Sequence, residues 1–434
     1  MQTPREITLK LLVSTERNQS YSNIALDKTL SKYTLLKDVD RRFITALYYG
    51  VIERKITLDA VISAHSSRPL DKLSESVRAI LRMGIYQLLY MDSVPDSAAV
   101  NESVLLAKDN KNPGTAGFVN ALLRSFIRDG KKLPHSGMRY KDLSVEYSCP
   151  EWLIKMWMTD YGEETAISML RSSQGRPPLT VRLNTARFSV EEIISELESE
   201  GVSAALRDDL AGCAELSGCG SCEKLSAYKK GMFHVQDASC QICAWCVDAK
   251  PGDTVLDMCS APGGKAFTIA ELMENKGRVI ALDLHENRVR LIKEGAKRLG
   301  LDIIEAKTNN AKVISEDIPQ ADSVLCDVPC SGLGVIRRKP EIKYCDKNAI
   351  EGLPSVQHDI LAASAKYVKP GGTLVYSTCT LNRAENDNQA ERFLSENKDF
   401  EPYEIEKFGS YKVTLTPDTS GGDGFFIARF RRKI

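Results

Sequence analysis

Two cysteines lie in sequence contexts that could place their thiols at one catalytic site. Cys330 lies in CDVPCS, residues 326–331, and Cys379 lies in YSTCTL, residues 376–381. Each follows a short apolar run that is typical of a buried β-strand. Loops at the carboxyl ends of parallel strands meet at one edge of a sheet, where ligands bind. Because one thiolate suffices for most covalent catalysis, the second thiol requires a chemical reason of its own.

The segments that must hold these cysteines alternate between strands and helices from residue 231 to the end of the chain. The predicted strands are TVLDMCS, RVIALDL, DIIEAKT, SVLCDVP and TLVYSTC. The predicted helices are AFTIAELM, ENRVRLIKEGAKRLG, SVQHDILAASAKYV and NDNQAERFLSEN. This alternation predicts a doubly wound parallel sheet, and we assign residues 231–434 to a Rossmann-like α/β domain.

A glycine-rich turn joins the first of these strands to its helix. Gly263 and Gly264, in VLDMCSAPGGKAFTIAELM, let the backbone approach a ligand closely. Asp283 ends the next strand, where a carboxylate can accept the hydroxyls of a ribose. The turn lacks the G-x-G-x-x-G of NAD sites, and Ala266 follows GGK where a P-loop has Ser or Thr. A nucleoside cofactor without a pyrophosphate fits this turn, S-adenosylmethionine being the commonest; a purely structural turn is the alternative.

The first third of the chain carries apolar residues at helical spacing over residues 3–130. Thr3 is a candidate N-cap with Pro4 at the first helical position, and Gly130 is placed to end the last helix. The stretch GKKLPHSG that follows has the composition of a linker. We therefore expect an all-α domain over residues 1–135.

A shorter mixed region follows over residues 141–230. It combines the strand candidate PLTVRLNT with the helix candidate VEEIISELESEG, which predicts a small α/β linker module packed on the next domain. The expected fold class is thus multidomain, with an all-α first domain, this module, and the Rossmann-like domain.

Composition and charge limit the class of protein and its partners. A chain of 434 residues implies two or three domains, and its twelve cysteines favour reduced thiols over a disulfide framework. No apolar run approaches the ~20 residues of a membrane span, and MQTPREITLK lacks a signal-peptide core, so we expect a cytoplasmic protein. Residues 1–140 hold 21 Lys and Arg against 14 Asp and Glu, on a chain of net charge +0. This surplus favours a polyanionic partner, an ordinary solvated helical surface being the alternative.

Four motifs together resemble one enzyme family. MCSAPGGK, LDLHENR, CDVPCSGLG and YSTCTL resemble the RNA cytosine-C5 methyltransferases, and GFVNALLR resembles the NusB-type RNA-binding domain. This combination is similar to the bacterial 16S rRNA methyltransferase family called RsmB (also Sun or Fmu), over nearly the whole chain. The resemblance implies an NusB-like RNA-binding domain, S-adenosyl-L-methionine as methyl donor, and methylation of carbon 5 of a cytosine in 16S rRNA.

The resemblance also implies a role for each thiol. Cys379 would add to carbon 6 of cytosine and so make carbon 5 nucleophilic enough to take a methyl group. Cys330 would act in product release, as or beside the general base, when the C5 proton leaves and the enzyme–base bond breaks. Asp327 would hold the N3–N4 edge of the cytosine. From its position alone, and not from the resemblance, we expect Lys265 to lie near both ligands and to help keep a thiolate ionised.

A cofactor site is implied by the same resemblance. Its predicted residues are Cys259, Ser260, Ala261, Pro262, Gly263, Gly264, Lys265, Asp283, Asn310 and Asp327. Where the family carries an acidic residue beside the adenine, this chain reads KTNNAK, with Asn310 as the match and Asn309 as the alternative. An amide can still hydrogen-bond adenine.

The remaining cysteines raise the hypothesis of a metal site. Cys219 and Cys222 form a CxxC pair, and Cys240, Cys243 and Cys246 follow at three-residue intervals. ASCQICAWCVD is, however, predicted to be one helix, on which thiols at this spacing do not converge on an ion. We therefore predict no metal site and interpret these cysteines as small apolar residues.

Several alternatives remain open on the sequence alone. The RNA could be tRNA or 23S rRNA, since a binding surface cannot be identified from pattern. A non-catalytic RNA-binding assembly factor is disfavoured because it has no use for Cys330 and Cys379. A DNA cytosine methyltransferase uses one cysteine in a PC context, so the second thiol disfavours DNA as substrate. We expect a monomer without membrane contact, acting on 16S rRNA as naked RNA or in an early small-subunit intermediate.

Overall fold

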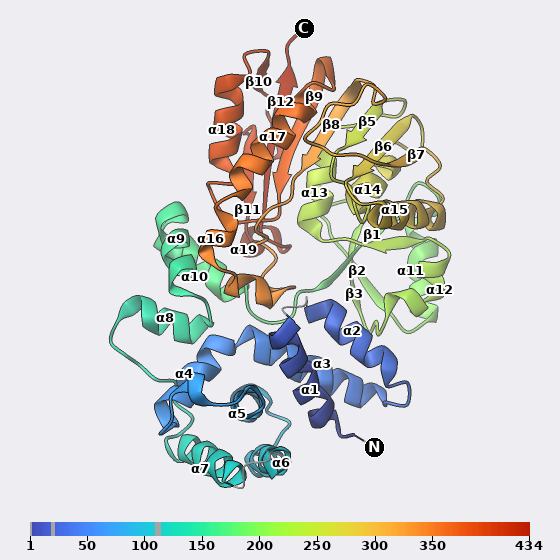
Figure 1. The fold of residues 1–434 in the computed structure, drawn as a ribbon. Helices are drawn as coiled ribbons and strands as arrows, with labels where there is room; N and C mark the ends of the chain where they lie inside the picture. The colour runs from blue at the N-terminus through green and yellow to red at the C-terminus, as the bar shows by residue number, and fades with distance from the viewer. Residues whose placement is uncertain (1, 19–21, 109–113) are drawn as a thin grey trace. The chain divides into compact units, whose positions relative to one another are not determined.

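The structure is a computed structural model that describes residues 2–18, 22–108 and 114–434. The chain divides into two compact units (Figure 1). The helical unit contains Met1–Gln174 together with Arg338–Cys345, and the catalytic unit contains Gly175–Arg337 together with Asp346–Ile434. No helix in the described ranges is long and apolar enough to cross a membrane.

The helical unit confirms the all-α prediction for the first part of the chain. Glu6 N donates to Thr3 Oγ1 at 3.2 Å, so Thr3 caps the first helix as predicted. Gly130, with φ of 71°, lies just beyond the end of α7. The helices are α1 (Pro4–Asn18), α2 (Ser22–Lys32), α3 (Asp38–Glu53), α4 (Lys55–His65), α5 (Glu75–Tyr90), α6 (Asp96–Lys108), α7 (Thr115–Arg128), α8 (Arg139–Tyr147), α9 (Glu151–Tyr161) and α10 (Glu163–Ser172).

Residues 338–345, which include the 3-10 helix η3 (Pro340–Tyr344), pack within the helical unit although they lie far from it in sequence. Lys343 Nζ donates to the backbone oxygen of Glu53 at 2.7 Å, and burial lowers the pKa of Lys343 to about 8. Glu341 accepts hydrogen bonds from both the amide and the hydroxyl of Ser22. The chain therefore enters the helical unit shortly after Cys330, an arrangement that no sequence pattern indicated.

The catalytic unit begins with a small antiparallel sheet in the strand order β2-β3-β1-β4. The capping box of Ser189 and Glu192 fixes the start of its first helix. The elements are β1 (Leu179–Leu183), α11 (Val190–Ser199), β2 (Ser203–Leu206), β3 (Cys213–Ser217), α12 (Ser226–Lys229) and β4 (Phe233–Val235).

The main sheet of the catalytic unit has eight strands, with the order β10-β12-β9-β8-β5-β6-β7 and β11 paired to β12 (Figure 1). Strands β5 to β9 are parallel, as predicted, but β12 runs antiparallel to β9. The expectation of an all-parallel sheet was therefore wrong in part, because β12 follows no crossover helix. The strands are β5 (Thr254–Asp257), β6 (Arg278–Asp283), β7 (Ile304–Thr308), β8 (Ala321–Asp327), β9 (Val368–Thr378), β10 (Phe400–Pro402), β11 (Lys412–Leu415) and β12 (Phe425–Arg432).

Helices cover both faces of this sheet, and alternate residues of each strand face opposite layers. One apolar layer joins β5 residue Val255 to α13, α14 and α15; the other joins Leu256 to α17 and α18. The Rossmann-like prediction is thus confirmed. The helices are α13 (Ala238–Cys246), α14 (Gly264–Leu272), α15 (Glu286–Leu299), α16 (Lys347–Ile350), α17 (Leu353–Ala365), α18 (Asp387–Glu396) and α19 (Pro417–Ser420).

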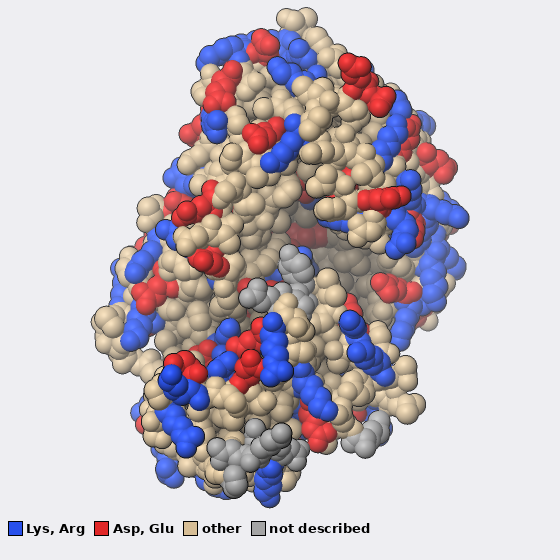
Figure 2. Space-filling model, in the orientation of Figure 1, with Lys and Arg blue, Asp and Glu red and all other residues tan. Residues whose placement is uncertain are grey.

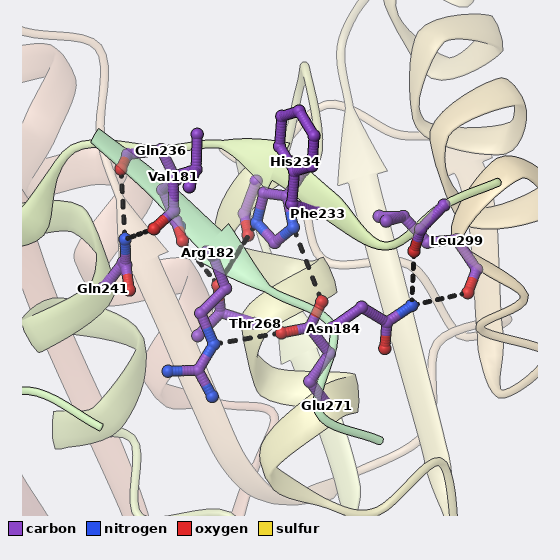
Figure 3. Close-up of polar contacts among 12 residues, drawn as sticks. Val181, Arg182, Asn184, Phe233, His234, Gln236, Gln241, Thr268, Glu271 and Leu299 are labelled. Atoms are coloured by element: carbon purple, nitrogen blue, oxygen red, sulfur yellow. Dashed lines mark hydrogen bonds and ion pairs between the residues drawn. The ribbon is translucent and has the colours of Figure 1, made fainter. Parts of the chain in front are cut away.

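A buried polar network joins the small sheet to α14 and α15 (Figure 3). Arg182 Nε on β1 donates to Glu271 Oε2 on α14 at 3.0 Å, with side-chain exposures of 6% and 0%. Thr268 Oγ1 donates to Gln236 Oε1, and Asn184 Nδ2 donates to the backbone oxygen of Leu299 at 2.9 Å. Since α14 begins at the predicted cofactor turn, the small sheet helps to hold that turn in place.

We expect a Glu271→Leu variant to lose about 3–5 kcal/mol of unfolding free energy, because Arg182 would remain buried without its carboxylate. Denaturant titration followed by circular dichroism measures this loss. The double variant Glu271→Leu/Arg182→Met should recover most of it, since an apolar pair leaves no buried charge. A loss no larger than that of the exposed control Glu294→Leu would contradict the assignment.

Candidate active site

Three aspartates and a threonine end the four adjacent parallel strands at one edge of the main sheet. Asp257 ends β5, Asp283 ends β6, Asp327 ends β8 and Thr378 ends β9. Because these strands are parallel neighbours, their following loops gather at the same edge. The predicted catalytic and cofactor residues therefore lie in the catalytic unit along one edge.

The two thiols of the PC and TC motifs are in contact. Cys330 Sγ lies 3.3 Å from Cys379 Sγ, although the residues are 49 positions apart. The hydrogen bond with Cys379, followed by burial, raises the pKa of Cys330 well above the usual range of a thiol. Cys330 therefore holds its proton at neutral pH.

A partly buried ion pair joins the first turn of α14 to the end of β8. Lys265 Nζ, in the first turn of α14, donates to Asp327 Oδ2 at 2.8 Å. Burial opposes the Lys265 charge, but nearby negative charge, chiefly that of Asp327, raises the pKa of Lys265 well above its usual value. Ser377 Oγ donates to the other oxygen, Asp327 Oδ1, at 2.8 Å. The carboxylate thus stays oriented while keeping lone pairs for a ligand.

The glycine turn has the conformation that its sequence indicates. Gly263 has φ of 111°, which an L side chain rarely adopts, and α14 begins at the next residue. Asp283 Oδ2 accepts a hydrogen bond from Ala261 N at 3.3 Å and pairs with Arg288 Nη1 at 3.2 Å. Arg288 Nη2 also donates to the Ala261 oxygen at 2.7 Å. These contacts tie the turn to the end of β6.

The two asparagines after β7 differ in environment. Asn310 is exposed, and its Oδ1 accepts a hydrogen bond from Lys312 N at 3.1 Å. Asn309 N donates to the backbone oxygen of Asp283, and Asn309 Nδ2 is buried without a hydrogen-bond partner. An unsatisfied buried donor costs ~1–3 kcal/mol, so Asn309 is ready for an acceptor on a bound ligand.

Asp257 is a buried carboxyl group that the sequence reasoning did not select. Burial raises the pKa of Asp257 to about 7, with the neighbouring Asp327 charge adding to the shift and Lys265 opposing it. Its position at the end of β5, immediately before the glycine turn, was the available signal. A cationic ligand at this edge would favour the ionised carboxylate.

The clustered cysteines do not form a metal site with other residues of the described chain. Cys240, Cys243 and Cys246 lie on α13, which confirms the predicted single helix, and the last two are fully buried. Cys219 Sγ and Cys222 Sγ lie 3.5 Å apart at the edge of the small-sheet core.

Acidic and basic side chains are interspersed on the molecular face that Figure 2 shows. Within the catalytic unit, α15 exposes Arg288, Arg290, Lys293 and Lys297. Such side chains can bind phosphate groups, but Arg288 also forms an ion pair with Asp283.

Comparisons with known proteins agree with this architecture. The family described as 16S rRNA methyltransferase RsmB/F matches residues 244–431, the NusB family matches residues 2–128, and the RsmF/B-like ferredoxin-like domain matches residues 149–218. The earlier predicted boundaries at residues 135, 141 and 230 stay predictions.

Relatives match over the whole chain. A probable ribosomal RNA small subunit methyltransferase B from Bacillus subtilis (strain 168) is 41% identical, over 99% of this chain and 98% of its own length. The crystal structure of PH0851 covers 100% of this chain and 99% of that one, with 26% identity and a TM-score of 0.83. The fold of NSun6 from Pyrococcus horikoshii, solved with SFG, covers 65% of this chain and 98% of that one, with 24% identity and a TM-score of 0.59. The resemblance found in the sequence is thereby confirmed: this chain belongs to the ribosomal RNA small subunit methyltransferase B family of S-adenosylmethionine-dependent RNA methyltransferases.

Proposed function

We propose that this enzyme methylates carbon 5 of one cytosine in 16S rRNA through a covalent bond between Cys379 and carbon 6. The observation that carries the proposal is the contact of two thiols, 3.3 Å apart, in the loops that follow Asp327 and its hydrogen-bond partner Ser377. The name of the Bacillus subtilis relative supports small-subunit rRNA as the substrate. The reaction would then take place in the cytoplasm, on naked rRNA or on an early subunit intermediate.

The first stage activates the base. The Cys379 thiolate adds to carbon 6, and the C5–C6 electron pair becomes available at carbon 5. Bound S-adenosylmethionine supplies the electrophilic methyl group that carbon 5 takes up. Asp327 holds the N3–N4 edge of the ring as negative charge moves onto it, and Lys265, which donates to Asp327 Oδ2, helps to orient that carboxylate. The target base must leave its stack to reach these groups.

The second stage releases the product. The C5 proton leaves, the C5–C6 double bond re-forms, and the Cys379 sulfur departs as a thiolate. Cys330 is protonated before the reaction, which suits a group that is not the nucleophile. When Cys379 is bonded to carbon 6, Cys330 loses the hydrogen bond that contributes most to its raised pKa, so its pKa falls. The Cys330 thiol can then give its proton to water, and the resulting thiolate, or a water molecule that it orients, takes the C5 proton.

The cofactor site proposed here uses the turn 259–265 and the ends of β6 and β8. The open N-terminus of α14 suits a carboxylate, and Asp283 suits the ribose. For the adenine we favour Asn309 over Asn310, because the buried Asn309 amide nitrogen has no partner and Asn310 caps its own turn. These residues fit S-adenosylmethionine without a pyrophosphate site.

The test of the function is product analysis. Unmodified 16S rRNA, 23S rRNA and tRNA, each incubated with the enzyme and labelled S-adenosylmethionine, are digested to nucleosides. We expect label in 5-methylcytidine from 16S rRNA, and none with the Cys379→Ala variant. Labelled 5-methylcytidine from tRNA or 23S rRNA would change the substrate. No label in any RNA, or in reconstituted small-subunit intermediates, would favour the non-catalytic assembly factor.

Cofactor binding should also release a proton. At pH 6 most of Asp257 is protonated, since burial raises its pKa to about 7 in the ligand-free protein. S-adenosylmethionine carries a net positive charge, which lowers the pKa of a nearby carboxyl group. Titration calorimetry in buffers of different ionisation enthalpy should detect release of close to one proton at pH 6 and almost none at pH 8.5. Asp257→Asn should abolish the release at pH 6; persistent release would assign it to another group.

A further inference from the structure

The loop between β9 and α18 carries two polar side chains that the proposed reaction does not use directly. Glu385 and Asn386 are both 0% exposed, and they lie six and seven residues after Cys379. A buried carboxylate and a buried amide persist only where their hydrogen-bonding groups are satisfied. Their partners include residues that flank the two thiols, and Glu385 also accepts hydrogen bonds from Gln357 and Asn382.

Glu385 contacts the residue after Cys330 directly and the residue before it through Gln357. Its Oε2 accepts a hydrogen bond from Ser331 N at 2.9 Å, and its Oε1 accepts one from the Ser331 hydroxyl. Gln357 Nε2 donates both to Glu385 Oε2 at 2.8 Å and to the backbone oxygen of Pro329 at 3.0 Å. The carboxylate therefore fixes the backbone before and after Cys330.

Asn386 makes the equivalent contacts around Cys379. Its Oδ1 accepts a hydrogen bond from Thr378 Oγ1 at 2.6 Å, and its Nδ2 donates to the backbone oxygen of Thr380 at 2.9 Å. One amide thus bridges the two residues that flank Cys379. Because an amide offers one acceptor and one donor group, neither Asp nor an apolar residue can reproduce both contacts.

The two loops also contact each other beyond the thiols. The Ser331 and Thr380 hydroxyls lie 2.7 Å apart, and Gly334 N donates to the backbone oxygen of Cys379 at 3.0 Å. These contacts keep the two loops in one register. The distance between the thiols therefore depends on the contacts of both Glu385 and Asn386, which we call the two clamps. A displacement of about 1 Å at a reacting group can slow a reaction about 100-fold.

We propose that Glu385 and Asn386 are positioning residues that act on different thiols, Glu385 on Cys330 and Asn386 on Cys379. Glu385 also places a negative charge near Cys330, which helps to keep that thiol protonated until Cys379 has reacted. The inference rests on the proposed division of labour between the thiols. It predicts that the two neighbouring residues affect opposite halves of the reaction.

Thiol alkylation of the ligand-free protein tests the clamps independently of any RNA chemistry. Iodoacetamide labelling at pH 8, followed by peptide mass spectrometry, gives a rate for each cysteine. In Glu385→Gln, whose amide nitrogen faces the donors around Ser331, Cys330 should react about tenfold faster, with a smaller change at Cys379. In Asn386→Asp, the larger change should occur at Cys379. Equal changes at both thiols in both variants would overturn the proposal.

The covalent RNA adduct separates the two roles during turnover. Glu385→Gln should accumulate protein bound to rRNA, with release slowed on the order of 100-fold, whereas Asn386→Asp should form the adduct about 100-fold more slowly. Glu391→Gln and Asn388→Asp, matched substitutions at exposed positions of α18, should behave as wild type. Equal slowing of both stages in both variants would again overturn the proposal.

Two milder variants keep the test valid if a clamp variant fails to fold. Ser331→Ala removes one contact of Glu385, and Thr378→Val removes one contact of Asn386. Ser331→Ala should change the alkylation rate of Cys330 in the same direction as Glu385→Gln does. Thr378→Val should change the alkylation rate of Cys379 in the same direction as Asn386→Asp does. If Cys330→Ala traps no adduct while the wild type methylates RNA, the proposed role of Cys330 in release fails, and the alkylation rates alone then decide whether each residue positions its own thiol.

Discussion

A Cys330→Ala variant is expected to remain covalently bound to its RNA after methyl transfer. Its Cys379 can still add to carbon 6, but the release stage lacks the thiol that lies 3.3 Å away in the wild type. Removing a general base typically costs 10²–10⁴-fold in the step that it serves, so the adduct should outlive the assay. A denaturing gel of protein mixed with unmodified RNA and S-adenosylmethionine would show a retarded band.

The second thiol supplies the control for this experiment. The double variant Cys330→Ala/Cys379→Ala should form no band, because it has no nucleophile. Sequencing of the trapped RNA would identify both the RNA and the cytosine. Efficient methylation by Cys330→Ala with no adduct would mean that Cys330 has no part in release, and a band that survives in the double variant would assign the bond to another residue.

The second large effect is expected from Asp327→Asn, which we predict to lower kcat by about 10²–10³-fold. The neutral amide cannot balance the positive charge of Lys265, whose Nζ lies 2.8 Å from Asp327 Oδ2. In either orientation of the amide, its NH2 group replaces an oxygen that accepts a hydrogen bond from Lys265 or from Ser377. The ring charge that develops during addition to carbon 6 would then lose its oriented carboxylate. Single-turnover methylation of rRNA at saturating cofactor measures the change.

Lys265→Met provides the complementary test of this pair. It leaves Asp327 partly buried without its cation, so the unfolding free energy should fall as well as the rate. Asp327→Asn should also lose stability, because Lys265 keeps its charge without the carboxylate, but its rate should fall by more than the unfolded fraction explains. If both variants lost stability and neither lost rate beyond the unfolded fraction, the pair would be structural and not catalytic.

Many features of both units could be predicted from local sequence. The strands that end at Asp257, Asp283 and Asp327 were predicted because short apolar runs alternate with helices of period 3.6. The Thr3 cap and the Gly130 stop were predicted because capping depends on a few adjacent residues. Their confirmation follows from the local nature of these interactions.

Other features depended on segments that are distant in sequence. Strand β12 was missed because the strand–helix alternation indicates only parallel neighbours, whereas β12 pairs with β9 in the antiparallel direction. The packing of residues 338–345 in the helical unit was missed because Lys343 and Glu53 are 290 positions apart. No local pattern carries information about such contacts.

The sequence by itself determined which reactive groups this protein carries, because the types of Cys330, Cys379, Asp327 and Lys265 and their motifs are local. Only the tertiary structure decided how these groups act together. It brought the two thiols to 3.3 Å, joined Lys265 to Asp327, and gave the buried Glu385 two donors that are 54 and 28 positions away, Ser331 and Gln357. The physical reason is that such distances depend on packing of the whole sheet and its helices, in which burial favours one arrangement of chain segments that local propensity leaves free.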